Sequence, residues 1–352
     1  MAYVLVKPLA EKTQYLPNTI DFLFDIGVGN EFVGNSFRLE GELVVTNDED
    51  PITNVSILYD SKAGAHSFVQ QIVTQLNDRT VENINYYGRY AAMKSQSLDA
   101  PINKMAVSNN ATELKMLNDE MTIAIESLAA AGTGRSFSVK PYFCLNALNG
   151  NLAYAKSGQV KVSLTLASVA QCLFGGDATL ADTSYYLQNL NMACRVVPQS
   201  KASASPTCAV VACVRQNIQS NNTTLSIIVP IATTSFSATF RNAILESTFT
   251  ANYLELDTLP ETSRVEMTFA DSLSNLIEFP LETQEEITLN YLASMGSVGK
   301  HSMTLEQEVQ GIGLAYNEIL QNTKLGVNII CGADNVANPY VAYFYFKGLI
   351  GI

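Results

Sequence analysis

The dominant pattern along the chain is an alternation of apolar and polar residues with a period of two. Residues 159–166 show it most clearly, with valine or leucine at every second position and polar residues between them. The same alternation recurs at 264–269 and 286–291. Because successive side chains of a strand point to opposite faces, each segment predicts a half-buried strand. Further strands are predicted at 37–46, 54–59, 72–76, 137–145, 185–197, 209–218, 223–229, 236–245, 325–331 and 340–350.

Helical periodicity is confined to a few segments. The best candidate is about 111–130, where apolar residues recur at steps of three and four and Gly132 follows as a C-terminal stop. Shorter helices are predicted near 62–71 and 87–93. Nothing alternates strand with helix, as a parallel sheet would require. The pattern therefore predicts an all-β protein, a sandwich or barrel, with short helical insertions.

A small, polar stretch bracketed by prolines divides the chain at 198–207. It cannot pack a core, so we predict a linker at 199–208 between a first domain, 36–198, and a second, 209–352. Each half is close to the size of an eight-stranded sandwich with its loops. Residues 1–35 mix apolar pieces with two prolines. We predict that they form an N-terminal arm, which becomes ordered when copies of the chain assemble. The alternative is an irregular segment that covers the first sandwich.

Composition narrows the function classes. The chain of 352 residues is 47% hydrophobic and only 15% charged, with a net charge of −12. The high apolar fraction excludes a disordered chain, and the acidic balance argues against a nucleic-acid surface. No run of about 20 apolar residues and no signal peptide are recognised, so neither a membrane span nor secretion is expected. A surface rich in Ser, Thr, Asn and Gln suits burial against copies of the chain. An ordinary neutral β-protein is the alternative.

The residues that usually carry catalysis or bind metals are scarce. There are two histidines: His66 is expected to be structural and His301 solvated, and neither metal binding nor Ser/His/Asp catalysis is expected from them. No cysteine pair has the Cys-x-x-Cys spacing, so reduced core thiols are predicted, and a bond between Cys208 and Cys213 is not favoured. The cysteines are Cys144, Cys172, Cys194, Cys208, Cys213 and Cys331.

The sequence also contains partial signs of two further kinds of site, a nucleotide-binding loop and a pair of catalytic carboxylates. The glycine pairs at 27–29, 132–134 and 311–313 lack the residues that complete a nucleotide-binding loop, and turns are predicted instead. Asp257, Glu261 and Glu266 fall near one strand–turn–strand, as a two-carboxylate glycosidase would need. Exposed carboxylates in a turn are the favoured interpretation. We therefore expect no catalytic, cofactor-binding or metal-binding residue, no cofactor and no enzymatic activity.

Three segments, in order along the chain, carry a resemblance to a known family. The first is 64–73, which begins Gly-Ala-His-Ser-Phe, followed by the Tyr-rich 85–90. The second combines the alternating 158–166 with 186–196. The third is 337–346, where Asn-Pro-Tyr precedes alternating aromatic residues. Together they resemble the double jelly-roll major capsid proteins of adenoviruses, tailless lipid-containing phages, virophages and polinton-like viruses.

The resemblance implies a fold of two consecutive eight-stranded antiparallel jelly rolls. It also implies a viral major capsid protein that assembles as pseudo-hexagonal homotrimers and tiles an icosahedral shell. The implied partners are other copies of the chain, a vertex (penton) protein and minor capsid proteins, with an internal lipid membrane as a further candidate. Sequence-specific nucleic acid binding is not implied. The implied location is the virion, after assembly in the host cytoplasm or nucleus.

A binding module is the alternative function. The 16 Tyr and 15 Phe could stack on sugars in a two-domain β-sandwich carbohydrate-binding or adhesion protein. The absence of Trp and of a recognised secretion signal argues against it.

Overall fold

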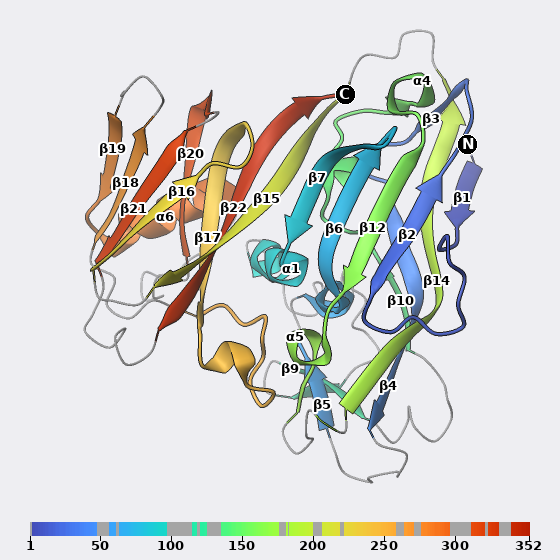
Figure 1. The fold of residues 1–352 in the computed structure, drawn as a ribbon, viewed down its shortest axis with the longest axis horizontal. Helices are drawn as coiled ribbons and strands as arrows, with labels where there is room; N and C mark the ends of the chain where they lie inside the picture. Colours follow the sequence, from blue (N-terminus) through green and yellow to red (C-terminus); the bar gives the residue numbers. More distant parts are fainter. Residues whose placement is uncertain are drawn as a thin grey trace.

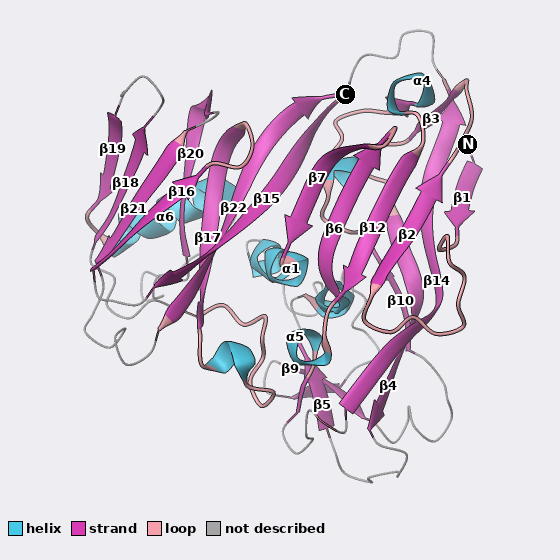
Figure 2. Ribbon diagram, viewed as in Figure 1, coloured by secondary structure: helices cyan, strands magenta, loops and turns pink. Residues whose placement is uncertain are grey.

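Strands dominate the structure and form two sandwiches that stand side by side (Figures 1 and 2). The computed structural model describes residues 2–47, 56–60, 63–96, 115–117, 120–124, 135–175, 181, 183–199, 206–218, 222–257, 264–270, 276–295, 311–320, 323–330 and 339–352. The all-β fold of two eight-stranded antiparallel jelly rolls with short helical insertions is confirmed.

The first jelly roll packs two sheets face to face around one hydrophobic core. Its inner sheet has the order β2 (Thr19–Phe24), β12 (Val160–Leu166), β6 (Val69–Leu76) and β7 (Arg79–Asn85). The opposite sheet contains β10 (Arg135–Val139), β4 (Arg38–Asn47), β14 (Thr183–Pro198) and β1 (Ala2–Val6), extended by β3 (Asn30–Phe32) and β11 (Leu152–Ala153). A small sheet of β13 (Phe174–Gly175), β5 (Ser56–Tyr59), β9 (Glu120–Ala124) and β8 (Lys115–Leu117) lies at one end.

The second jelly roll repeats this arrangement with eight strands. Its inner sheet has the order β15 (Thr207–Ile218), β22 (Tyr340–Gly351), β17 (Thr233–Asn242) and β20 (Gly311–Leu320). The opposite sheet has the order β16 (Asn222–Ile228), β21 (Lys324–Ile330), β18 (Arg264–Ala270) and β19 (Leu276–Leu281). One parallel pair, Asn83 on β7 with Ala212 on β15, joins the two inner sheets into a single eight-stranded sheet. We call this junction the seam.

Strand β22 holds the seam together because both of its faces are buried. Phe344 and Phe346 point into the core of the second jelly roll. Tyr343 and Tyr345 point the other way, into the core that the first jelly roll shares with the seam. The Tyr345 hydroxyl donates a hydrogen bond of 3.0 Å to the carbonyl of Tyr86, directly before helix α1 (Tyr87–Gln96). A strand that is apolar on both faces is typical of burial between two layers.

A buried arginine of the first jelly roll also crosses the seam. Arg89, in α1, is fully buried, and its guanidinium donates to the carbonyl of Tyr253. Its central carbon lies 4.5 Å from the ring centre of Tyr343 and 4.8 Å from that of Tyr253. The ring faces therefore replace part of the water that this cation loses on burial.

Glu82, on β7, is the buried acid of the seam. One carboxyl oxygen accepts a hydrogen bond of 2.9 Å from the Val211 amide on β15. The other accepts one of 2.7 Å from the Cys144 amide, at the start of a short 3₁₀ turn, η2 (Cys144–Asn146). Burial raises the pKa of Glu82 to about 7, although both hydrogen bonds favour the carboxylate. This side chain thus links the two jelly rolls and titrates near neutral pH.

Two secondary-structure predictions are wrong. Residues 286–291 are not a strand but part of helix α6 (Gln284–Met295). Ile287, Tyr291 and Met295 are buried at four-residue steps, and a six-residue window could not separate that period from two. The Glu286 amide donates to the Thr283 hydroxyl at 3.2 Å, so a Thr-x-x-Glu helix start was present in the sequence.

The long helix predicted at 111–130 is the second error. Its described residues form strands β8 and β9, which pair with each other in an antiparallel hairpin. The rest of that range lies outside the described residues. The helix predicted at 62–71 is reduced to a 3₁₀ turn, η1 (Gly64–Phe68), because β6 begins at Val69. The helix at 87–93 is confirmed as α1.

The strand predicted at 137–145 is shorter than expected. β10 ends at Val139, and Pro141, which has no amide hydrogen to donate, precedes the η2 turn. Short helices α4 (Tyr154–Ser157) and α5 (Val169–Cys172) and the turn η3 (Leu245–Ser247) complete the described elements. β14 ends at Pro198, directly before the predicted linker, and β15 begins at Thr207, which the prediction had placed within the linker. Residues 200–205 of that linker lie outside the described part.

The N-terminal residues differ from the separate arm that the prolines predicted. β1 pairs with β14, and β2 pairs with β12 along its whole length. Phe22, Phe24 and Phe32 are fully buried in the first core. The reason is the two-residue alternation within β2, which Pro17 precedes and does not interrupt. In the single chain this segment belongs to the first jelly roll, and contact with neighbouring copies stays a prediction.

Replacing Phe344 by Ala tests the role of β22. The phenyl ring is fully buried, and it lies 6.0 Å, centre to centre, from Phe236. The cavity left should lower the free energy of unfolding by about 3–5 kcal/mol. Leu349→Ala, on the same strand but 51% exposed, should cost less than about 1 kcal/mol. Urea unfolding measures both, and equal losses would contradict the placement of β22 between two cores.

Replacing Glu82 by Gln tests the pH dependence of the seam. With a pKa of about 7 in the folded chain and 4.5 ordinarily, the folded chain keeps a proton that the unfolded chain releases. The free energy of unfolding should therefore fall as pH rises from about 4.5 to about 7, by roughly 3 kcal/mol. The Gln variant cannot titrate, so its stability should lack this fall.

Urea unfolding at several pH values between 5 and 7.5 measures the effect of Glu82→Gln. Glu285→Gln, on the exposed side of α6, is the matched control and should keep the native pH dependence. The same slope in the native protein and in the Glu82→Gln variant would show that Glu82 is not the titrating group.

Candidate functional site

His66, the first candidate from the sequence, is a buried side chain among aromatic rings. Its Nδ1 lies 2.9 Å from the hydroxyl of Tyr87, and its ring stacks on Tyr142 with 4.9 Å between centres. The Tyr142 amide donates to the same Tyr87 hydroxyl at 2.9 Å, which directs the hydroxyl hydrogen toward His66. Burial raises the pKa of Tyr87 well above its usual value. These contacts fix the η1 turn against α1. His301 lies outside the described residues.

The described cysteines are free thiols. Cys144, Cys172, Cys194 and Cys208 are buried, and Cys213 is half-buried. Burial raises the pKa of Cys194 to about 12 and that of Cys172 further. Since the thiolate is the nucleophile and the metal ligand, Cys172 and Cys194 stay protonated and act as small apolar side chains. Cys331 lies outside the described part of the chain.

Two of the three carboxylates considered for glycosidase chemistry are described, and they form ion pairs with different arginines. Asp257 forms a 2.8 Å ion pair with Arg241, which is fully buried, and accepts a hydrogen bond from the Asn242 amide. Glu266 pairs with Arg264 at 2.7 Å on β18. Asp257 is therefore not the exposed turn residue that the sequence predicted, because it neutralises a buried cation. Glu261 lies outside the described residues.

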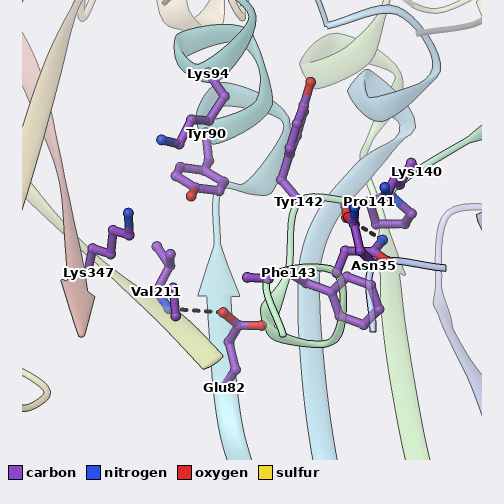
Figure 3. Close-up of a pocket in the computed structure, with 13 residues that line it drawn as sticks. Asn35, Glu82, Tyr90, Lys94, Lys140, Pro141, Tyr142, Phe143, Val211 and Lys347 are labelled. Atoms are coloured by element: carbon purple, nitrogen blue, oxygen red, sulfur yellow. Dashed lines mark hydrogen bonds between the residues drawn. The ribbon is translucent and has the colours of Figure 1, made fainter. Parts of the chain in front are cut away.

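Sequence reasoning missed a cavity of about 350 Å³ beside the seam (Figure 3). Its walls include Tyr90, Tyr142 and Phe143 from the first jelly roll and Val211 from the second. Glu82 lies at its floor in this view, with its carboxyl bonded to the Val211 amide.

Three lysines line the same cavity. Lys94 comes from α1, Lys140 from the loop after β10, and Lys347 from β22. Figure 3 shows Lys94 and Lys347 on one side and Lys140 on the other. Burial and the nearby Lys347 lower the pKa of Lys94 to about 8. Burial and the charge of Arg38 lower the pKa of Lys140. No local motif could have revealed this set, because the three residues are far apart in the sequence.

The two ends of the block expose large apolar side chains. At the N-terminal end these are Tyr3 and Leu5 on the edge strand β1 and Leu9 and Leu16 in the following loop. Residues 8–21 also line a hollow of about 450 Å³ there. At the opposite end, where β19 and β20 are the last strands of their sheets, the exposed apolar residues are Phe279, Leu289 and Ile319.

The described residues contain neither a metal-binding cluster nor a membrane-spanning helix. No group of three or more His, Cys, Asp and Glu side chains among them is placed to hold a metal ion. Their helices are each too short or too polar to cross a membrane.

Comparisons with known proteins were made by sequence and by structure. No protein-family model matches the sequence, and no curated protein matches it. Among solved structures, the Faustovirus major capsid protein aligns over 100% of this chain and 90% of its own, with a TM-score of 0.64 and 9% identity. The Sputnik virophage structure aligns over 100% and 87%, with a TM-score of 0.60 and 11% identity.

A third comparison agrees with these two. The PBCV-1 virus capsid aligns over 100% of this chain and 94% of its own, with a TM-score of 0.58 and 9% identity. These are structures of double jelly-roll capsid proteins. The chain therefore has the double jelly-roll fold of viral major capsid proteins, as its sequence segments suggested.

Proposed function

We propose that this chain is a viral major capsid protein that assembles as homotrimers and tiles an icosahedral shell. The observation that carries the proposal is the pair of eight-stranded jelly rolls standing side by side, joined by one continuous sheet (Figure 1). The capsid proteins named above share this fold over the whole chain. A fold alone does not determine a function, so the surfaces of the block supply the second line of support.

Two jelly rolls in a rigid block suit trimer formation. Three such blocks around a three-fold axis place six jelly rolls in a ring, which has a near-hexagonal outline. Hexagonal units cover a surface by simple repetition, and identical trimers can then form a closed shell. This is cyclic closure followed by weaker lateral contacts.

Several of the exposed apolar side chains lie on surfaces that such a ring would bring into contact. In a three-fold ring each copy uses two different surfaces, so one end of the block meets the opposite end of its neighbour. Tyr3 and Leu5 lie at one end, and Phe279 and Ile319 at the other. Pairing these ends would bury apolar surface that the single chain leaves in water. The low content of charged residues suits the weaker contacts between trimers.

The remaining partners follow from this role. A closed shell of hexagonal units needs a different unit at its five-fold vertices, which we assign to a vertex (penton) protein. Minor capsid proteins and an internal lipid membrane would contact the surface of each block that faces the inside of the shell. The protein would then reside in the virion after assembly in the host cytoplasm or nucleus. The role is structural and needs no cofactor.

The carbohydrate-binding alternative gains no support. Stacking on sugars needs exposed aromatic faces. Tyr3 and Phe279 are the aromatic members of the large exposed apolar side chains in the described part of the chain, and they lie at opposite ends of the block.

Assembly in solution tests the proposal directly. The purified chain should elute as a particle of about three times 38.2 kDa, and the trimer should resist dilution. Size-exclusion chromatography with light scattering measures the mass, and electron microscopy of concentrated samples should show hexagonal particles or shells. A chain that stays monomeric at all concentrations would overturn the proposal.

A charge placed at either end of the block tests which surfaces form the trimer. Leu5→Asp on β1 and Ile319→Asp on β20 replace side chains that are 58% and 61% exposed, so the isolated chain should fold normally. Each should weaken the trimer by at least about 100-fold, because a carboxylate would be buried at the contact.

Leu349→Asp is the control for these two variants, because Leu349 is 51% exposed on β22 and lies at neither end. It should leave the trimer intact. Light scattering over a dilution series measures all three variants. Dissociation by the control alone, or intact trimers in both end variants, would contradict the pairing of the two ends.

A further inference from the structure

Two buried thiols, one from each jelly roll, meet at the seam. Cys144 is the first residue of the η2 turn in the first jelly roll, and Cys208 is the second residue of β15 in the second. Both side chains are buried, with 0% and 1% of their surface exposed. The thiol of Cys144 forms a side-chain hydrogen bond with the thiol of Cys208. Two residues far apart in the chain thus place their sulfur atoms side by side.

Backbone contacts hold the two segments that carry these cysteines together. Leu148, just after η2, forms an antiparallel bridge with Cys208. The Asn149 amide donates to the carbonyl of Thr207 at 3.2 Å, and the Thr207 amide donates to the side-chain oxygen of Asn149 at 3.0 Å. The proximity of the thiols therefore follows from the packing of the two jelly rolls and not from the rotation of two free side chains.

No other chemistry in the described part of the chain uses this pair. No set of three His, Cys, Asp and Glu side chains is placed there to hold a metal ion. Burial and the contact with Cys208 raise the pKa of Cys144 well above its ordinary value, so its thiol is protonated at neutral pH. Two adjacent sulfur atoms can, however, join to each other, and their contact meets the first geometric condition for that bond.

We propose that Cys144 and Cys208 form a disulfide bond across the seam when the chain meets an oxidant of the disulfide class, such as glutathione disulfide. The thiolate of one cysteine attacks the oxidant and forms a mixed disulfide, and the thiolate of the other then displaces glutathione. Together the two cysteines lose two protons and two electrons. One glutathione disulfide gains them and becomes two molecules of glutathione, so the exchange is balanced.

The seam cavity gives the oxidant a route to this pair. Phe143 and Ala209, the neighbours of the two cysteines in the chain, line the cavity of about 350 Å³. Another lining residue, Ala147, is exposed, so the cavity reaches the surface. Cys208 is close to the end of its strand and Cys144 is in a single short turn, and such positions open locally at a low free energy. Local opening next to the cavity exposes both thiols to the oxidant.

The bond would join the two jelly rolls covalently at the seam. Closing a long loop restricts the unfolded chain, so a disulfide between the domains stabilises their packing. In a reducing cytoplasm the thiols stay free, and in an oxidising medium outside the cell the bond forms. The inference goes beyond the proposed capsid function and does not depend on it, since both cysteines belong to one chain.

Refolding in glutathione buffers tests the proposal. The full chain is unfolded in urea with a reductant and then diluted into mixtures of reduced and oxidised glutathione. Acid stops the exchange, and mass spectrometry of the digested protein identifies the linked peptides. A peptide pair that joins Cys144 to Cys208 should accumulate as the share of oxidised glutathione rises. Its equilibrium constant should be about 100-fold or more larger in the folded chain than in the chain kept in urea, because the fold holds the thiols together.

Variants identify the bond and its effect on stability. Oxidation of the native chain should raise the urea concentration at the unfolding midpoint. Cys144→Ala and Cys208→Ser should each abolish both the linked peptide and this rise, and the second position provides a test if a change at the first disturbs folding. Cys213→Ser is the matched control, because it removes another thiol of β15. It should keep the bond and the rise in midpoint.

Three results would overturn the proposal. The first is the absence of the peptide pair that joins Cys144 to Cys208 at every glutathione ratio. The second is a bond between Cys208 and Cys213 in its place. The third is an equal equilibrium constant in the folded chain and in urea, since the contact between the thiols would then have no effect on the bond. Each readout concerns a bond within one chain, so failure here is distinguishable from failure of the chain to form trimers.

Discussion

The burial of both faces of β22 is the constraint on which the rest of the structure depends. Phe344 and Phe346 complete the second core, and Tyr343 and Tyr345 complete the seam with the first jelly roll. A strand committed to two cores cannot move relative to either without exposing aromatic surface to water. The two jelly rolls therefore behave as one block, and the proposed shell unit would need that rigidity to repeat the same geometry in every copy.

Polar groups at the seam restrict how the two jelly rolls can pack. Arg89 reaches from α1 to the carbonyl of Tyr253, and Glu82 reaches from β7 to the Val211 amide. A buried charged group that loses its hydrogen-bond partner is costly, whereas the same group with its partner adds little net stability. These contacts consequently penalise other arrangements more than they strengthen the native one. Apolar burial supplies the stability, and the buried charges favour one orientation.

Large parts of the fold were predictable from local pattern. Strict alternation located β12 and β18, because a half-buried strand must alternate in that way. The method failed where one window fitted two periods, as at α6. Helical spacing likewise misled at 111–130, where the described residues form strands. In the N-terminal segment Pro8 and Pro17 suggested an irregular arm, yet β2 pairs along its whole length with β12. At 111–130 and in the N-terminal segment, pairing between strands outweighed the local signal.

The sequence by itself determined the all-β class and the scarcity of residues for catalysis, since these depend on composition and near-neighbour spacing. Its ordered segments also indicated the double jelly roll. Tertiary structure alone decided what meets at the seam. Lys94, Lys140 and Lys347 are distant in the chain, as are Glu82 and its hydrogen-bond donor Val211. Such groups come together only when two sheets join, and no local pattern encodes a contact between residues so far apart.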